Sequence, residues 1–380
     1  MGVTVYGATA IANFELRIAN SLRKVGDPMS KSANAILALC RAYYGKRLLT
    51  ADYDALLACA SLPEFVAALR SRGDYAADVT PTVLGDLRAK TLEGMCEKHR
   101  FDRFVTLCRF ELAIGNRFYQ YFILRIEIDQ ILKSTLLLFG GKKEDYLMGM
   151  HPFMDKHLSI DLFALGRANS LEEIGDALQK TRYGSIYRGC LSAGNRSYLT
   201  FEQAFEAYFS NEVKALVKTC FSGKEEKALH DLICRSLDCR LIATMLRTLT
   251  YYGDHLPLST LVSPALVTMT LFDEGQLRRF SACETADDVL AVLERSPYAG
   301  WLTAADCAHP ETQLQRRLLE LCRKAIRFSV SPGVVMFCYL LLSQNEAVNL
   351  TCIIEGIKFN VPRPVIRDHL ILAPGDTDKG

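Results

Sequence analysis

The chain has 380 residues, of which 49% are hydrophobic, and its 45 basic residues nearly balance 43 acidic ones to give a net charge of +2. This length suits two or three domains with substantial cores, and the even spread of charge, without a basic stripe, argues against a nucleic-acid partner. The longest clean apolar run covers only residues 334 to 342. That is about half the length of a membrane-spanning helix, so we expect a cytoplasmic protein without a membrane span.

Helical patterns dominate the chain from one end to the other. Near the N-terminus Phe14, Ile18 and Leu22 share one helical face, and this extra helix is expected to end near Gly26. The long helical segments that follow cover residues 101–139, 201–220, 227–252, 311–328 and 332–357. Strand signals are sparse, because few runs alternate apolar and polar residues. The sequence therefore predicts an all-α fold, with a disordered tail from residue 374.

One short helical phrase occurs three times, as SLPEFVAAL from residue 61, SLEEIGDAL from residue 170 and TADDVLAVL from residue 285. Apolar residues in each copy follow a spacing that places them on one helical face. Ser61, Ser170 and Thr285 begin the copies, and an acid three positions later completes the pattern of a capping box. Each copy is followed by a tyrosine: Tyr75, Tyr183 and Tyr298. The starts lie 109 and 115 residues apart, which indicates a repeated unit of about 110 residues.

A second recurring feature is an acidic residue within an apolar helical segment. Asp129, Asp238 and Glu346 hold this place and lie 109 and 108 residues apart. A charge in such a segment must find a partner or shift its pKa. One interpretation is a proton carrier or a metal ligand, and the other is a carboxylate that caps or pairs with a neighbouring helix once in every unit. The threefold recurrence favours the structural interpretation, because a catalytic acid seldom needs three copies.

Two unrelated features that keep one period indicate an internal triplicate. Glycine-rich breaks fall where this period predicts them, at residues 140–143 and 253–257. The predicted organisation is an extra N-terminal helix at 1–30, repeat units at 31–141, 142–253 and 254–373, and a tail at 374–380.

No constellation in the sequence indicates a catalytic, cofactor-binding or metal site. The chain has no GxSxG, HExxH, GxGxxG or calcium-loop motif, and the GGKKED stretch from residue 140 lacks the spacing of a phosphate-binding loop. Thirteen cysteines are present without a CxxC motif, and Cys96 with His99 is the nearest thing to a ligand pair. We expect reduced, mostly buried thiols that act as small apolar residues.

The last repeat carries a succession of motifs that resembles the closing segment of one family. Residues 332–370 read as a Tyr-Leu-Leu helix, then Glu-x-x-Asn-Leu, a Gly-x-Lys turn and an Ile-Arg helix. The positions are Tyr339, Leu340, Leu341, Glu346, Asn349, Leu350, Gly356, Lys358, Ile366 and Arg367. A second succession, Arg-Leu-Leu, Tyr-x-x-Leu-Leu and Ser-Leu-x-Glu-Phe, lies between residues 33 and 75. Together the two successions resemble the C-subunit family of the V-type ATPases (A-type in archaea), whose eukaryotic equivalent is the d subunit. Asn349 has no counterpart in the first two units, where Leu132 and Leu241 stand at the equivalent places.

The resemblance implies a non-catalytic rotor subunit with no cofactor and no small-molecule substrate of its own. Proteins of this family form a pseudo-threefold funnel of three similar helical domains, which stands on the membrane rotor ring and receives the central axle made of the D and F subunits. Torque from ATP hydrolysis would pass through the chain to a ring that carries protons or sodium ions. The resemblance therefore implies a cytoplasmic protein that is peripheral to the membrane as part of the ATPase complex.

Two other classes of function compete with this interpretation. A helical-repeat scaffold that binds other proteins without a role in ion transport would be expected to have more than three units and a shorter repeat of about 34 to 47 residues. An enzyme built around the cysteines and acids would require a thiol with a depressed pKa.

Overall fold

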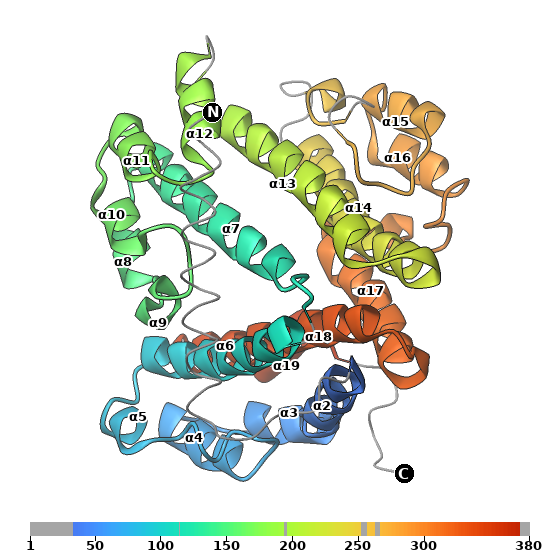
Figure 1. Cartoon of the computed structure of the whole chain (residues 1–380). Helices are drawn as coiled ribbons and strands as arrows, with labels where there is room; N and C mark the ends of the chain where they lie inside the picture. Colours follow the sequence, from blue (N-terminus) through green and yellow to red (C-terminus); the bar gives the residue numbers. More distant parts are fainter. Residues whose placement is uncertain (1–32, 114, 194–195, 252–256, 263–266, 373–380) are drawn as a thin grey trace. The chain divides into compact units, whose positions relative to one another are not determined.

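A computed structural model of the chain describes residues 33–113, 115–193, 196–251, 257–262 and 267–372 (Figure 1). Every regular element in these ranges is helical, which confirms the predicted all-α class. The described residues divide into two compact units, one within residues 108–221 and the other within residues 33–107 and 222–372. The predicted N-terminal helix at Phe14 to Leu22 and the tail from residue 374 lie outside the described residues.

The unit of residues 108–221 is built on two long helices, α7 and α13, that pack against each other. Helix α13 forms because Phe201, Phe205, Phe209, Val213 and Val217 repeat every four residues and bury one continuous stripe. The short helices α10 and α11 contact α7, and α12 contacts both α11 and α13. Its helices are α7 (Gln120–Phe139), α8 (Glu144–Met148), α9 (Pro152–Asp155), α10 (Leu162–Arg167), α11 (Leu171–Ala177), α12 (Gly184–Ser192) and α13 (Tyr198–Cys220).

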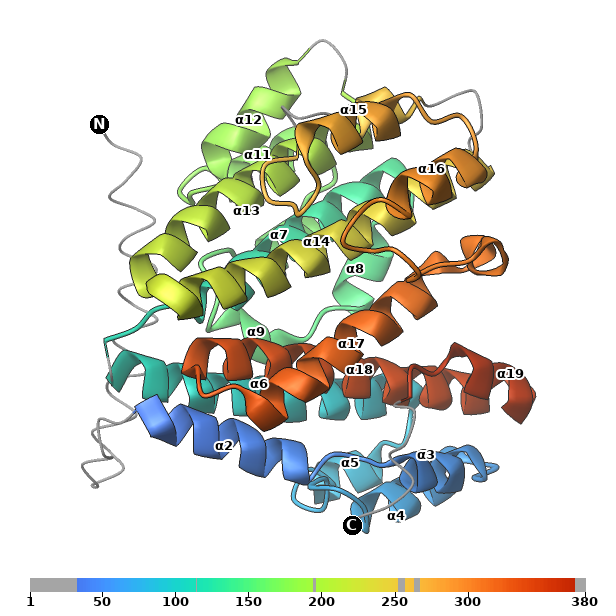
Figure 2. The same cartoon turned by 90° about the vertical axis from the view of Figure 1, so that its right-hand side faces the viewer.

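The other unit brings the two ends of the described chain together around helix α18. Figure 2 shows α17 crossing between α14 and α18, and the short helices α2 and α4 contact α18 from another side. Its helices are α2 (Ala33–Gly45), α3 (Thr50–Leu57), α4 (Leu62–Arg70), α5 (Pro81–Gly85), α6 (Ala89–Ala113), which continues into the first unit, α14 (Gly223–Tyr251), α15 (Glu274–Ser281), α16 (Ala286–Leu293), α17 (Pro310–Phe328), α18 (Pro332–Lys358) and α19 (Arg363–His369), with 3-10 helices η2 (Leu258–Thr260) and η3 (Ala304–Ala308).

Helix α18 is long and apolar because it is enclosed by other helices. Every residue from Gly333 to Leu340 is buried, as expected for a helix that is hydrophobic on all sides. Pro332 stands at the first helical position, where its missing N–H has no helical partner to lose, and the Ser331 hydroxyl accepts a hydrogen bond from the Val334 N–H. The apolar run noted in the sequence is therefore a core helix of this unit.

The three predicted caps hold the starts of three short helices. The hydroxyls of Ser61, Ser170 and Thr285 accept hydrogen bonds from backbone N–H groups three residues later, at the beginnings of α4, α11 and α16. Each of these helices is only two to three turns long, so a satisfied first turn contributes a large share of its local stability.

Two details of the chain's course depend on glycines. The segment from residue 101 to 139, which the sequence predicts as one or two long helices, is two, because α6 ends at Ala113 and Gly115 adopts a φ of 79° that few other residues tolerate. The expected Gly-x-Lys turn is wrong, since Gly356 and Lys358 belong to the last turns of α18. A Cβ at Gly356 would lie 2.4 Å from Ile366 Cδ1, so this glycine lets α19 pack directly on α18.

The division of the chain into three repeats stays a prediction. The two compact units separate near residues 107 and 221, whereas the expected repeat boundaries fall at 141 and 253. The contacts explain the offset, because long helices α7 and α14 pack with the short helices that follow them in sequence.

Candidate functional site

Asp238 lies at the centre of the first of three similar polar clusters. Its side chain is fully buried on α14. The Tyr298 hydroxyl donates a hydrogen bond to Asp238 Oδ2 at 2.6 Å, and the Leu271 N–H donates to the same oxygen at 2.9 Å. Leu271 precedes α15 and Tyr298 follows α16, so one carboxylate fixes both ends of this pair of short helices against α14.

Glu127 occupies the same place in the unit of residues 108–221. This carboxylate is fully buried on α7, where it accepts a hydrogen bond from the Tyr183 hydroxyl at 2.5 Å and another from the Ser159 N–H. Ser159 precedes α10 and Tyr183 follows α11. The Arg182 guanidinium lies 3.7 Å from the carboxylate and provides a nearby positive charge.

Glu346 on α18 makes the third cluster and joins the two ends of the described chain. The Tyr75 hydroxyl donates to Glu346 Oε1 at 2.7 Å, and the Leu48 N–H donates to Oε2 at 2.9 Å. Leu48 precedes α3 and Tyr75 follows α4, so the order of elements matches the other two clusters. The ring of His99 stacks on Tyr75 with 4.2 Å between centroids and keeps the tyrosine in place.

The three acid–tyrosine clusters, as we call them, share one layout. A carboxylate on a long helix accepts a hydrogen bond from the N–H of a loop before the first short helix, and another from a tyrosine hydroxyl after the second. The members are Leu48, Tyr75 and Glu346; Glu127, Ser159 and Tyr183; and Asp238, Leu271 and Tyr298. The capped helices at Ser61, Ser170 and Thr285 lie between the two donors in every case.

The sequence interpretation chose the wrong acid in the first segment. Asp129 is exposed and forms an ion pair with Arg125 on the same helix, and Glu127 takes its place in the cluster. The helical phase explains the difference and was readable from the sequence. Apolar residues lie four positions before and after Glu127, at Ile123 and Ile131, whereas Asp129 has Arg125 and Lys133 at those positions.

Burial raises the pKa of two of these carboxyls. Removal from water raises the pKa of Asp238 to about 6, because a charge is disfavoured in an apolar surrounding. Burial also raises the pKa of Glu346, while the hydrogen bonds from the Leu48 N–H and the Tyr75 hydroxyl oppose the rise. Both hydrogen bonds stabilise the ionised form, so donors and burial work against each other in these clusters.

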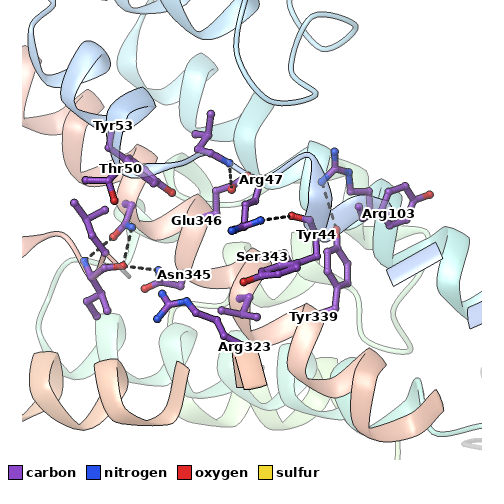
Figure 3. A pocket seen from close by; sticks show the side chains of 16 residues that line it. Tyr44, Arg47, Thr50, Tyr53, Arg103, Arg323, Tyr339, Ser343, Asn345 and Glu346 are labelled. Carbon is purple, nitrogen blue, oxygen red and sulfur yellow. Dashed lines mark hydrogen bonds between the residues drawn. The ribbon is translucent and has the colours of Figure 1, made fainter. Parts of the chain in front are cut away.

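A small pocket opens beside Glu346, between α2, α17 and α18 (Figure 3). Asn345 and Asn349 on α18 hold the chain that forms one edge of it, because both side-chain amides donate to the Ile371 carbonyl, at 2.9 and 3.2 Å. The Ile371 N–H donates in return to Asn349 Oδ1 at 3.1 Å. This contact gives Asn349, which has no counterpart in the first two units, a structural role in the last segment.

The remaining sequence candidates do not gather into a reactive centre among the described residues. Nine of the thirteen cysteines are buried. Burial raises the pKa of Cys96 and Cys239, the opposite of the change that creates a nucleophilic thiolate. His99 contacts Asp78, with Nδ1 to Oδ2 at 2.6 Å, and Cys96 is a separate buried thiol. In the described ranges no group of three or more His, Cys, Asp or Glu side chains is arranged to hold a metal ion.

Comparison with known proteins gives one family. The model of the family described as ATP synthase (C/AC39) subunit matches residues 36–369. Comparison with curated proteins gives no match. Within the part of the chain that the structure describes, every helix is too short or too polar to cross a membrane.

We expect Tyr298→Phe to lower the free energy of unfolding by about 1.5 to 3 kcal/mol, because the substitution leaves a buried carboxylate without one of its donors. Tyr146→Phe is the matched control, since Tyr146 is also fully buried but its hydroxyl has no hydrogen-bond partner among the described residues. Urea denaturation of both variants checks the difference. Equal losses in the two variants would show that the hydroxyl of Tyr298 contributes nothing specific.

Asp238→Asn should change how stability depends on pH. The folded pKa of Asp238, about 6, exceeds its ordinary value of 3.8. Between these values the folded state binds more protons, so the contribution of Asp238 to stability falls as pH rises, by about 3 kcal/mol over the window. The free energy of unfolding, measured from pH 3 to 7, should therefore fall in the wild type as pH rises. In Asp238→Asn the fall should be smaller by this amount. Parallel curves for the two proteins would contradict the assignment.

Proposed function

Since the chain belongs to the ATP synthase (C/AC39) subunit family, we propose that it is a non-catalytic central-stalk subunit of a rotary V- or A-type ATPase. The match over residues 36–369 is the observation that carries this proposal. In this role the chain is a component of the rotor, lies at the cytoplasmic side and is peripheral to the membrane as part of the complex.

The proposed task is to couple the axle of the D and F subunits to the membrane rotor ring, so that ATP hydrolysis in the head drives transport of protons or sodium ions. A part that transmits torque must resist bending and must keep its elements in register. Long helices tied to short ones by buried, charge-assisted hydrogen bonds suit this requirement, because such bonds are directional as well as strong. The acid–tyrosine clusters at Glu127, Asp238 and Glu346 support the proposal in this physical sense.

We also propose that three repeat units form the pseudo-threefold funnel expected from the sequence. The recurrence of one cluster layout supports three related units, and the acids of the corrected set lie 111 and 108 residues apart. The cluster at Glu346 uses short helices from the beginning of the chain. A closed arrangement of three units requires such a contact between the last long helix and the first short helices, whereas an open solenoid does not.

The test is to remove the chain from its own cells and measure ATP hydrolysis and ATP-driven ion transport in isolated membrane vesicles. The proposal predicts that ATP-driven transport falls to the level seen without ATP, and that purified wild-type chain restores it. Because the chain would carry torque and perform no chemistry, transport should be lost at least as completely as hydrolysis.

Ser210→Ala provides a control for the restoration, because this residue lies within α13 and the change favours the helix. It should restore transport as well as the wild type. Unchanged transport in vesicles that lack the chain would contradict the coupling role. That result would favour the alternative of a helical scaffold for other proteins, without a part in ion transport.

A further inference from the structure

The turn between α17 and α18 exposes two large apolar side chains. Phe328 is 81% exposed and Val330 is 83% exposed, and both fractions exceed those of every other large hydrophobic residue in the described ranges. Only Ser329 separates the two, at the turn of the helical hairpin that α17 and α18 form (Figure 2). Single exposed apolar residues are ordinary on a protein surface, whereas two that adjoin at one turn indicate a contact with an apolar partner.

Hydrogen bonds from two other helices hold the backbone of this turn. The Arg41 guanidinium on α2 donates to the Ile326 carbonyl at 3.0 Å and to the Ser329 carbonyl at 2.7 Å. The Ser331 hydroxyl donates to the Glu225 carboxylate in the first turn of α14. The turn is thus fixed through its polar groups while its apolar side chains face water. A turn that is already fixed loses little conformational freedom when a partner covers those side chains.

Basic groups outnumber acidic groups on the elements that meet at this turn. The exposed basic residues of α2, of the first turn of α14 and of the end of α17 are Arg41, Lys224, Lys227, Lys324 and Arg327. The acids of the same stretches are Glu225 and Glu226, neither of which is exposed. The Glu225 carboxylate is also engaged by the Ser331 hydroxyl. The surplus of exposed positive charge attracts an anionic partner.

An apolar pair next to exposed basic groups matches the two layers of a lipid surface. Apolar side chains gain free energy when they enter the boundary between headgroups and acyl chains, and Lys or Arg side chains gain free energy near anionic lipids. A purely apolar protein surface would cover Phe328 and Val330 but would leave the basic groups without a counter-charge. The combination therefore favours a membrane surface that contains anionic lipids.

We propose that the turn between α17 and α18 docks on an anionic lipid surface. Phe328 and Val330 enter the headgroup layer, and the basic residues of α2, α14 and α17 meet the lipid phosphates and carboxylates. The fixed backbone of the turn keeps the two apolar side chains together for this contact. The proposal goes beyond the coupling role and does not depend on it.

Sedimentation of the full chain with lipid vesicles tests the proposal. The wild type should bind vesicles of phosphatidylcholine with phosphatidylserine about tenfold or more tightly than vesicles of phosphatidylcholine alone, because several basic groups lie close to the surface. Binding to the anionic vesicles should weaken as the salt concentration rises, since salt screens these charges.

The double variant Phe328→Ser with Val330→Ser tests the apolar part of the contact. It should weaken binding to the anionic vesicles about tenfold or more, because the two side chains no longer leave water on docking. The matched control is Phe359→Ser with Val365→Ser, which makes the same changes at exposed residues beyond the other end of α18. The control should leave the binding constant unchanged.

Two further variants test the charge and the place of the contact. Lys324→Gln with Arg327→Gln should weaken binding to the anionic vesicles about tenfold. Phe328→Trp should keep the binding and show a blue shift of tryptophan fluorescence when the anionic vesicles are added. The wild type, whose single tryptophan is Trp301, supplies the background for this signal.

Thermal unfolding confirms that each variant is folded. The proposal is overturned if the wild type binds the anionic vesicles no more tightly than the neutral ones, and binding to neither would assign the turn to a protein surface instead. It is also overturned if Phe328→Ser with Val330→Ser binds as tightly as its control, if Lys324→Gln with Arg327→Gln binds as tightly as the wild type, or if Phe328→Trp shows no shift beyond the background.

Discussion

The structure depends on one interaction, a carboxylate on a long helix that holds a tyrosine hydroxyl and a loop N–H at the same time. A carboxylate cannot be placed in an apolar interior at low cost unless hydrogen bonds replace its water. Glu127 meets this condition while fully buried, because both of its oxygens accept hydrogen bonds. Asp238 meets it at Oδ2 alone, since its Oδ1 has no hydrogen-bond partner among the described residues. Because the two donors lie on either side of a pair of short helices, each carboxylate fixes that pair against the long helix, and apolar packing then fills the space around it.

The same interaction explains how short helices remain ordered. Helices of about eight residues are marginal on their own, and α4, α11 and α16 are of this size. In each case a side-chain hydroxyl caps the start of the helix. The tyrosine that follows the helix donates a hydrogen bond from its hydroxyl to the buried carboxylate. Glu346 lies near the end of the described chain and both of its donors, Leu48 and Tyr75, lie near the beginning. This cluster therefore holds the two ends together. A buried carboxylate whose hydrogen-bond donors have fixed positions also favours one arrangement of the helices over other arrangements that bury similar apolar surface.

Local features of this fold were predictable, and contacts between distant segments were not. The caps at Ser61, Ser170 and Thr285 and the proline start of α18 follow from residues within a few positions of each other. Glu127, and not Asp129, was predictable as the buried acid, because Ile123 and Ile131 place it on the apolar face of the helix. The partner of Glu346 could not be predicted, because Tyr75 lies 271 residues away and no local pattern records that pairing. The pocket beside it depends on the same distant contacts and on the way two asparagines hold Ile371.

Hydrogen exchange at the Leu48 amide, measured in the wild type and in Glu346→Ala, tests the central claim most directly. The account predicts that removing the acceptor speeds exchange at Leu48 by about tenfold or more, as the loss of a net hydrogen bond to a charged group implies. The Leu271 amide, held by Asp238 in the same compact unit, serves as the internal reference and should change much less. If the Leu48 amide exchanges at the same rate in both proteins, or changes only as much as Leu271, the carboxylate does not hold the two ends of the chain together.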